Sequence, residues 1–306
     1  WEMVQAAHEN GADFIKLQTY STERFFHPSL TYFNSTKSME LSPEGTAELF
    51  AKSEKNGVQL FTTPFDPESV DFIEGFSPKL YKIASMDNDN TPLIEHIAQK
   101  GKPVIVSCGM ASFDEISQVL EAVKKTGNDQ LILLHCISDY PAKPESLNLE
   151  MIPYLKNTFN VPIGFSDHAI GLNSAFMAIS MGASMVEKHF TTDRKLADQM
   201  PDADHDISIE PQELSELIAF AEDASLMRGK APRQITSGEE EGRIAFRRGL
   251  YTRKAVKAGE KLSLENTVLL RPVKGIAANQ WKEVLGKSFL REIKAMETIN
   301  LSDLES

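Results

Sequence analysis

Residues 162–190 read PIGFSDHAIGLNSAFMAISMGASMVEKHF and carry the most informative pattern in the chain. An apolar run ends at Ser166-Asp167-His168, a segment with helical spacing follows, and a second apolar run ends at Glu187-Lys188-His189. The connection is long enough for one helix, so the pattern predicts a βαβ unit with parallel neighbouring strands. Both histidines then lie at the carboxyl edge of the sheet, where α/β proteins place their chemistry.

Two imidazoles at one edge of adjacent strands suggest a site for a divalent metal. A single histidine at a strand end is more often a buried side chain with a satisfied hydrogen bond. Here His168 and His189 each stand beside a carboxylate at corresponding ends of two strands. We therefore interpret them as a pair of metal ligands.

The alternation of strand and helix extends over most of the chain. We predict strands at 14–20, 59–65, 80–85, 103–109, 131–137, 162–168 and 184–190. A helix follows each strand, the first only after an irregular segment, 21–40, that we interpret as an active-site loop. One more helix opens the chain with no strand before it. This count predicts an α/β fold, a (βα)8 TIM barrel without its first strand, which we expect to precede Trp1 in the natural protein.

The pattern changes after residue 228, so we predict a barrel domain at 1–228. Residues 229–245 lack a hydrophobic period and contain three consecutive glutamates, which is typical of a linker. Residues 246–306 have short apolar runs separated by turns and predict a small β-rich domain, of a size that is only marginally stable alone.

Composition excludes several classes of protein. A hydrophobic content of 41% and a charged content of 25% indicate a soluble globular chain, with neither a membrane span nor a signal peptide. Two cysteines, Cys108 and Cys136, argue against a disulfide framework, so we expect buried thiols and a cytoplasmic location. The net charge of −12 argues against nucleic-acid binding. An anionic substrate would therefore need a locally positive site.

The predicted strands end in amines, hydroxyls and imidazoles instead of turn-forming residues. Each lysine alone is best explained as a solvated ion pair and each hydroxyl as a turn residue. Together, ammonium and hydroxyl donors at a barrel mouth suggest a cradle for phosphate or carboxylate. The positions are Lys16, Gln18, Thr62, Thr63, Lys82, Ser85, Ser107, His135, Ser138, Ser166 and Glu187.

Motifs along nearly the whole chain resemble the sialic acid synthase family, which includes N-acylneuraminate, pseudaminic acid, legionaminic acid and spore-coat polysaccharide synthases. The matching stretches are KLQT (16–19), TTPFD (62–66), KIASMDNDNTPLI (82–94), SCGM (107–110), HCISDYPA (135–142), GFSDHAIG (164–171), EKHFTTD (187–193), DHDISIEP (204–211) and LLRPVKGI (269–276). The resemblance implies a barrel joined to an antifreeze-like (SAF, β-clip) domain, in a homodimer with exchanged SAF domains. It also implies condensation of phosphoenolpyruvate with an open-chain N-acylated amino sugar, such as N-acetylmannosamine, to give a nonulosonic acid and phosphate.

The resemblance also implies roles for individual residues. His168 and His189 would bind Mn²⁺, or another divalent ion such as Mg²⁺. Arg271 would reach the partner's site near the N-acyl group. The positions matched to phosphoenolpyruvate binding are Lys16, Thr63, Lys82, Ser85, Ser107 and Ser166. The positions matched to catalysis, in contact with sugar or water, are Gln18, Tyr140, Glu187 and Asp204, the last preferred over Asp202.

The chain departs from the family pattern at some positions. It lacks the Glu-x-Gly-x-Asn-His stretch of the family's first strand, whose glutamate is implicated in catalysis. Cys108 stands where threonine is usual, and Ser138 where some members have asparagine.

Two other functions remain open from the residues alone. A Schiff-base aldolase for 2-keto-3-deoxy sugar acids also uses a barrel and would need one desolvated lysine, for which Lys82 is the candidate. A non-catalytic carbohydrate-binding protein would use the small domain as its binder. The pair of histidines and the appended domain favour the metal-dependent synthase.

Overall fold

The computed structural model describes residues 1–201 and 203–306, so Asp202 lies outside the described residues. The chain divides into two compact units, Trp1–Arg228 and Gly229–Ser306. We describe each unit separately.

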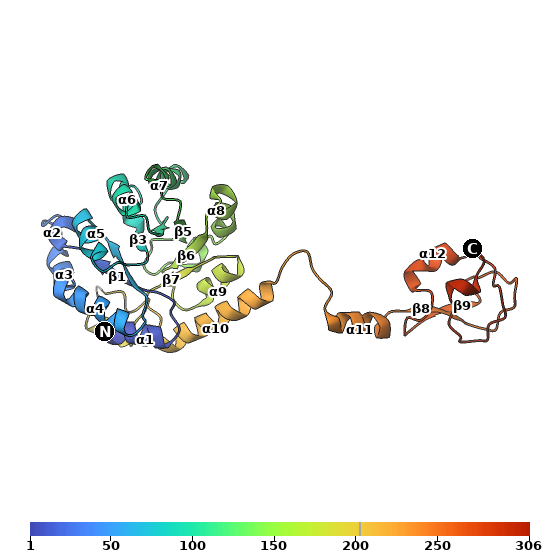
Figure 1. Ribbon diagram of the computed structural model, residues 1–306. Coiled ribbons are helices and arrows are strands. Elements are labelled where there is room, and N and C mark those ends of the chain that lie inside the picture. Colours follow the sequence, from blue (N-terminus) through green and yellow to red (C-terminus); the bar gives the residue numbers. More distant parts are fainter. Residues whose placement is uncertain (202) are drawn as a thin grey trace. The chain divides into compact units, whose positions relative to one another are not determined.

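The first unit is a curved parallel sheet surrounded by helices (Figure 1). Its strands pair in chain order, and in the described part of the chain the sheet stays open between its first and last strands. The strands are β1 (Ile15–Thr19), β2 (Leu60–Pro64), β3 (Tyr81–Ile83), β4 (Val104–Ser107), β5 (Leu131–Cys136), β6 (Ile163–Asp167) and β7 (Val186–Lys188). The prediction of a TIM-type barrel with one strand fewer than eight is confirmed by this open sheet.

Four helices of this unit begin at a capping residue. Ser42, Asp66, Asn90 and Ser112 each accept a hydrogen bond from a backbone N–H of the first turn that follows. No helix in the described ranges combines the length and the apolar character needed to cross a membrane. The helices are α1 (Glu2–Glu9), α2 (Thr22–Phe25), α3 (Phe33–Ser38), α4 (Pro43–Lys55), α5 (Pro67–Glu74), α6 (Thr91–Ala98), α7 (Phe113–Lys125), α8 (Met151–Phe159), α9 (Asn173–Ser180) and α10 (Pro211–Arg228).

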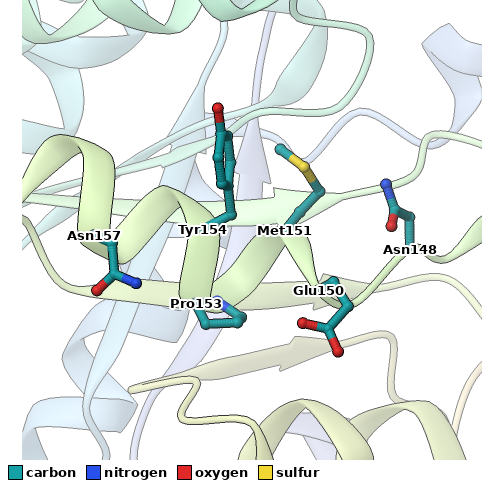
Figure 2. A pocket seen from close by; sticks show the side chains of 6 residues that line it. All are labelled: Asn148, Glu150, Met151, Pro153, Tyr154 and Asn157. Atoms are coloured by element: carbon teal, nitrogen blue, oxygen red, sulfur yellow. The ribbon is translucent and has the colours of Figure 1, made fainter.

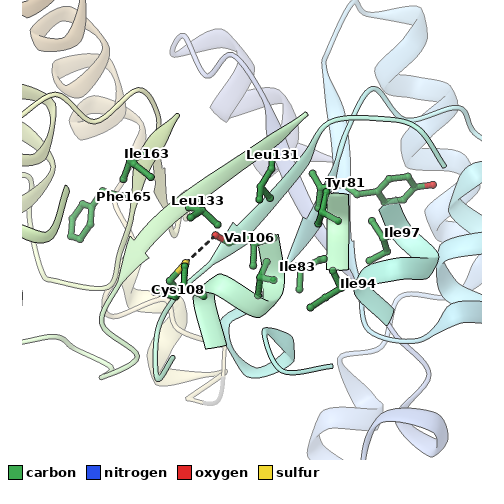
Figure 3. Packing of buried hydrophobic residues seen from close by; sticks show 14 of the residues in the cluster. Tyr81, Ile83, Ile94, Ile97, Val106, Cys108, Leu131, Leu133, Ile163 and Phe165 are labelled. Carbon is green, nitrogen blue, oxygen red and sulfur yellow. Dashed lines mark hydrogen bonds between the residues drawn. The ribbon is translucent and has the colours of Figure 1, made fainter. Parts of the chain in front are cut away.

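Alternate residues of the strands point to opposite faces of the sheet and form two apolar layers. The outer layer packs between strands and helices, and Figure 3 shows Tyr81, Ile83, Val106, Leu133 and Phe165 within it. These side chains are at most 1% exposed. The outer layer therefore fixes the helices to the sheet.

The inner layer fills the barrel and consists of Phe61, Leu80, Ile105 and Leu134, with Ile132 and Met185 beside them. Gly164 takes the corresponding position in β6, where a Cβ would lie 2.5 Å from a methyl group of Leu134. This apolar layer fills the barrel on the amino-terminal side of the mouth. The inward positions two residues further along the strands are polar, and they form the floor of the barrel mouth.

The predicted irregular loop 21–40 contains two short helices, α2 and α3. Arg24 donates to Asp66 at 2.9 Å, and the carboxylate of Glu40 accepts from both the backbone N–H and the hydroxyl of Thr22 at 2.8 Å. The first contact holds the segment against the start of α5, and the second joins the two ends of the segment. The prediction missed them because they join residues distant in the sequence.

The second unit contains a helix where a linker was expected. Residues of α11 (Ser237–Phe246) follow a capping box in which Thr236 and Glu239 exchange hydrogen bonds between side chain and backbone. The sequence contains this Thr-x-x-Glu signal, and the absence of a hydrophobic period obscured it. The domain boundaries at 228 and 245 stay a prediction.

The small β-rich part of this unit is built on the antiparallel strands β8 (Gly249–Thr252) and β9 (Thr267–Leu270), with α12 (Trp281–Val284). Gly275 has a φ of +65°, and a Cβ there would lie 2.2 Å from the carbonyl oxygen of Ile299. Only glycine fits that close approach. The unit has its own buried apolar core, formed by Leu250, Val256, Leu262, Ile276, Val284, Phe289, Ile293, Ile299 and Leu304.

Candidate active site at the barrel mouth

The inner face of the sheet places the predicted polar residues together above the apolar layer. The strand register aligns Ser166 with Glu187, and Gln18 with Thr63. Alternate residues of a strand share a face, so Lys82 and Ser107 point inward, each two residues after an apolar inward residue. Lys16 also points inward, because it pairs with the inward Phe61. The carboxyl ends of the strands thus surround one polar site.

Glu187 is the centre of this site. Its Oε1 accepts hydrogen bonds from Lys82 Nζ at 3.0 Å and from the Ser166 hydroxyl at 2.9 Å. Its Oε2 lies 3.5 Å from Lys16 Nζ. The carboxylate therefore joins β1, β3, β6 and β7 across the barrel, including the two strands between which the sheet is open.

The charges of this cluster do not cancel. Lys16 and Lys82 contribute two positive charges and Glu187 one negative charge, which leaves +1. Burial opposes ionisation of Glu187, but the two ammonium groups outweigh it and hold its pKa well below the usual range. Burial lowers the pKa of Lys16, although Glu187 acts in the opposite direction. The mouth is thus a positive site in a chain of net charge −12.

Two hydroxyls of the predicted cradle are buried and have no hydrogen-bond partner among the residues that the structure describes. Thr63 Oγ1 and Ser107 Oγ are both in this state, and their residues are 1% and 2% exposed. Buried polar atoms in native proteins are almost always paired with protein, water or ligand. Ser85 differs, because its hydroxyl already accepts from the backbone N–H of Gly109 at 3.1 Å. Free donors beside ammonium groups suit an anion.

His168 and His189 converge beside this cluster, with ring centroids 5.5 Å apart. His168 Nδ1 lies 2.8 Å from the carbonyl oxygen of Ile137, so this nitrogen carries the proton and Nε2 is left as a lone-pair donor. A second nitrogen held by a backbone carbonyl is the usual arrangement of a metal-binding histidine. Tyr140 stacks on His168 at 4.1 Å between centroids and fixes the ring plane.

His189 fits the same role. Burial, together with the positive charge of Lys16, lowers its pKa to about 4, so the ring is neutral at physiological pH. Its Nδ1 lies 3.9 Å from a carboxylate oxygen of Asp204. Within the described ranges, no three His, Cys, Asp or Glu side chains gather as a potential metal site. The two neighbouring imidazoles would suit a divalent metal, and this role stays a prediction.

His135 does not belong to the mouth, although it was grouped with the strand-end residues. It lies on the outer face, where Nε2 contacts the carbonyl oxygen of Leu147 at 2.7 Å and the ring stacks on Phe165. Cys136 points inward instead, with its sulfur 3.8 Å from His168 Nδ1. Counting alternate positions from the apolar Leu134 would have separated these two residues.

Two predicted residues are less closely tied to the cluster. Gln18 follows Lys16 on the inner face of β1 and is exposed at the mouth. Arg271 directly follows β9 in the second unit and is exposed. Its contact with a partner's site stays a prediction.

A surface hollow lies apart from this site. Figure 2 shows that it is formed along α8, and it is lined by Asn148, Glu150, Met151, Pro153, Tyr154 and Asn157. None of the residues predicted for catalysis or binding lines it. We assign the chemistry to the barrel mouth, because the charged groups and unpaired donors are there.

Comparison with known proteins agrees with this geometry. The sequence profile of the NeuB family matches residues 3–233, and that of the SAF domain matches residues 247–305. The N,N'-diacetyllegionaminic acid synthase of Legionella pneumophila is 32% identical, over 100% of this chain and 90% of its own. The pseudaminic acid synthase of Campylobacter jejuni serotype O:2 is also 32% identical, over 99% and 91%.

A solved structure shows the same similarity. The N-acetylneuraminic acid synthetase of Leptospira borgpetersenii, in complex with citrate, superimposes with a TM-score of 0.74 and 34% identity, covering 79% of this chain and 83% of its own. The family profile covers well over half of the chain. The chain therefore belongs to the NeuB family, and its carboxyl-terminal part is a SAF domain.

Proposed function

We propose that the chain condenses phosphoenolpyruvate with an N-acylated amino sugar to give a nonulosonic acid and inorganic phosphate. One observation carries the proposal. Two ammonium groups, Lys16 and Lys82, and two unpaired buried hydroxyls, Thr63 and Ser107, face one site whose charge is +1. Such a site is complementary to a small, strongly anionic substrate. The names of the relatives, which are synthases of legionaminic and pseudaminic acids, support the same reaction.

Phosphoenolpyruvate offers a phosphate and a carboxylate to this site. Lys16 and Lys82 supply charge-assisted hydrogen bonds, and Thr63 and Ser107 supply neutral donors that have no partner within the protein. Ser85 and Ser166 complete the set from the ends of β3 and β6, as the resemblance to the family implies. Holding the phosphate among several strands positions it for departure.

His168 and His189 would hold Mn²⁺, or another divalent ion, beside the phosphoenolpyruvate site. When bound, the metal supplies Lewis-acid polarisation of the sugar aldehyde. The Ile137 carbonyl orients His168, and the low pKa of His189 keeps its ring free to donate a lone pair.

Glu187, Tyr140, Asp204 and Gln18 are proposed to contact the sugar or the attacking water. Glu187 stays ionised between its two lysines and can accept a hydrogen bond from a hydroxyl or water. Tyr140 is about half exposed above the two imidazoles, where it would cover the aldehyde end of the sugar. In a homodimer with exchanged SAF domains, Arg271 would reach the N-acyl group of the sugar bound in the partner's site.

The Schiff-base alternative is disfavoured by the environment of its candidate lysine. Lys82 Nζ donates to the ionised Glu187 at 3.0 Å, and its side chain is 3% exposed. A Schiff-base lysine needs a free amine that can reach the carbonyl carbon, whereas Nζ of Lys82 is in direct contact with a carboxylate oxygen.

The test is phosphate release from phosphoenolpyruvate, measured with Mn²⁺ on a panel of N-acyl amino sugars. N-acetylmannosamine and 6-deoxy di-N-acetyl hexoses would be included. We expect release that depends on sugar, is abolished by a chelator and is lost in His189→Ala. Release without sugar, or release that persists in His189→Ala, would contradict the proposal. Borohydride trapping of pyruvate on Lys82 would instead support the aldolase.

A further inference from the structure

A buried ion pair lies on the outer face of β6 and β7, directly behind the two histidines. Asp167 and Lys188 are direct partners in the parallel ladder, and Lys188 Nζ donates to Asp167 Oδ2 at 2.9 Å. Their side chains are 0% and 3% exposed. This pair was absent from the predicted site, although both residues stand next to the histidines in the sequence.

The pair lies between two rungs that face the mouth. Ser166 and Glu187 form the rung before it and point inward, joined by a hydrogen bond of 2.9 Å. His168 and His189 follow it, beyond the last residues of β6 and β7. The strand ladder therefore stops at Asp167 and Lys188. Their contact is the last link between the two strands before the imidazoles.

Both members of the pair make further hydrogen bonds within the protein. Asp167 also accepts from the backbone N–H of Ala169 at 2.9 Å and from the Ser174 hydroxyl at 2.7 Å. Lys188 also donates to the carbonyl oxygen of Ala169 at 2.6 Å. The network thus joins the end of β7 to the turn after His168 and to the start of α9. A rigid turn on one side and a rigid strand end on the other fix the separation of the histidines.

Burying two charges on the outer face is a poor way to gain stability. Apolar residues of similar size are often as stabilising as a buried ion pair, because both charges lose their hydration. The outward residues that precede the pair in β6 and β7, Phe165 and Val186, are apolar. Charged residues in this layer therefore suggest a need for a defined geometry.

We propose that Asp167 and Lys188 are positioning residues that set the separation of His168 and His189 for a divalent metal. The inference rests on the proposed function, since it presumes that the histidines bind metal. The two residues do not contact the substrate site; they act through the backbone that carries the histidines. Loss of such supporting contacts typically weakens metal affinity about 10- to 100-fold.

The experiment compares Mn²⁺ affinity, measured by calorimetry, with the melting temperature of the metal-free protein. Lys188→Met leaves a buried carboxylate without its cation, so both affinity and melting temperature should fall. The double variant Asp167→Asn/Lys188→Met removes both charges and should recover most of the melting temperature. We expect its Mn²⁺ affinity to remain about 10-fold or more below that of the wild type.

Two further variants make the outcome decisive. Lys102→Met removes an ion pair with Glu74 that precedes β4, at the opposite end of the barrel, and should leave Mn²⁺ affinity unchanged. Ser174→Ala removes one hydrogen bond to Asp167 and tests the network if the double variant does not fold; we expect affinity about threefold weaker. If the double variant binds Mn²⁺ as tightly as the wild type does, the positioning role is wrong, although the metal site itself still stands. If the double variant does not fold, the same result in Ser174→Ala leads to the same conclusion. A wild type that binds no Mn²⁺ would overturn the metal site itself.

Discussion

Charged residues lie on both faces of the sheet at β6 and β7, and the two sets differ in how far the protein itself supplies their partners. On the outer face, Asp167 and Lys188 are at most 3% exposed and satisfy each other together with nearby hydroxyl and backbone groups. On the inner face, Glu187 of β7 is 19% exposed and contacts Lys16 of β1, 23% exposed, and Lys82 of β3, 3% exposed, so that the charges sum to +1. In the outer set, both carboxylate oxygens and the ammonium group have partners within the protein. The inner set is incomplete, which is the property expected of a binding site.

This difference separates structural from functional charges without reference to relatives. Both sets contain lysine and carboxylate side chains, and Glu187 and Lys188 are neighbours in β7, so residue type alone does not distinguish the two sets. Partners do, because a structural ion pair must be satisfied by the fold itself. A ligand site must leave some donors free until the ligand arrives.

The largest effect that tests the comparison is expected on the inner face. Lys82→Met would reduce the charge of the mouth from +1 to 0 and remove an ammonium donor from the anion cradle. We expect kcat/KM for phosphoenolpyruvate to fall on the order of 10⁴-fold, equivalent to about 5 kcal/mol. Lys100→Met, which removes a surface contact with Asp71, is the control and should keep normal kinetics. A loss smaller than 10-fold would mean that Lys82 does not hold the substrate.

On the outer face, we expect loss of a charge to lower the stability of the folded protein. Lys188→Met leaves the buried Asp167 carboxylate without its cation, which should cost about 3–4 kcal/mol in the free energy of unfolding. Lys102→Met, whose partner Glu74 is partly exposed, should cost less than about 1 kcal/mol. Urea denaturation of the metal-free protein measures both. Equal losses in the two variants would remove the distinction between a buried and a surface pair.

The sequence predicted the frame of this site well. Apolar runs that end in polar clusters located every strand of the barrel, since parallel strands buried on both faces are continuous apolar segments. Period-two alternation then determines which side chains point inward, and the cradle residues Lys16, Thr63 and Lys82 follow from it. Their grouping depends only on strand order.

Other features were recognised only in the three-dimensional structure. His135 was grouped with the mouth because its distance from the strand end was right, but its face was not considered. The Asp167–Lys188 pair was overlooked because both residues read as ordinary strand-end charges until the ladder showed them to be direct partners. The helix α11 was missed because its Thr-x-x-Glu capping signal was not used. The face of His135 and the cap of α11 can be read from the sequence pattern, whereas the pairing of Asp167 with Lys188 depends on strand register, which composition and periodicity do not report.

The low pKa of His189 predicts how stability depends on pH. The folded pKa of about 4 lies below the ordinary value of 6.5, so between these pH values the unfolded chain binds a proton that the folded protein does not. Metal-free protein should therefore lose stability as the pH falls from 6.5 to 4, and regain it as the pH rises. Because the side chain is 31% exposed, we expect roughly 1–2 kcal/mol instead of the full shift.

Urea denaturation at several pH values would measure this dependence. His189→Gln removes the titrating ring and should flatten the curve over the same interval. A curve of equal slope in His189→Gln would assign the effect to other groups.

The smallest expected effect is a difference in stability between variants of two adjacent threonines of β2 that lie on opposite faces of the sheet. Thr62 points outward and shares a 2.8 Å hydrogen bond with Thr19, whereas Thr63 points inward and has no partner. Thr62→Val should cost about 1 kcal/mol of stability, because it leaves the Thr19 hydroxyl buried and unpaired. Thr63→Val removes an unpaired buried hydroxyl and should raise stability by up to about 1 kcal/mol. The KM for phosphoenolpyruvate should rise about 10-fold in Thr63→Val, as a hydrogen bond to a charged group is lost. If Thr63→Val destabilises the protein as much as Thr62→Val does, the inner hydroxyl has a partner within the fold, and the reading of the inner face as incomplete is wrong at that position.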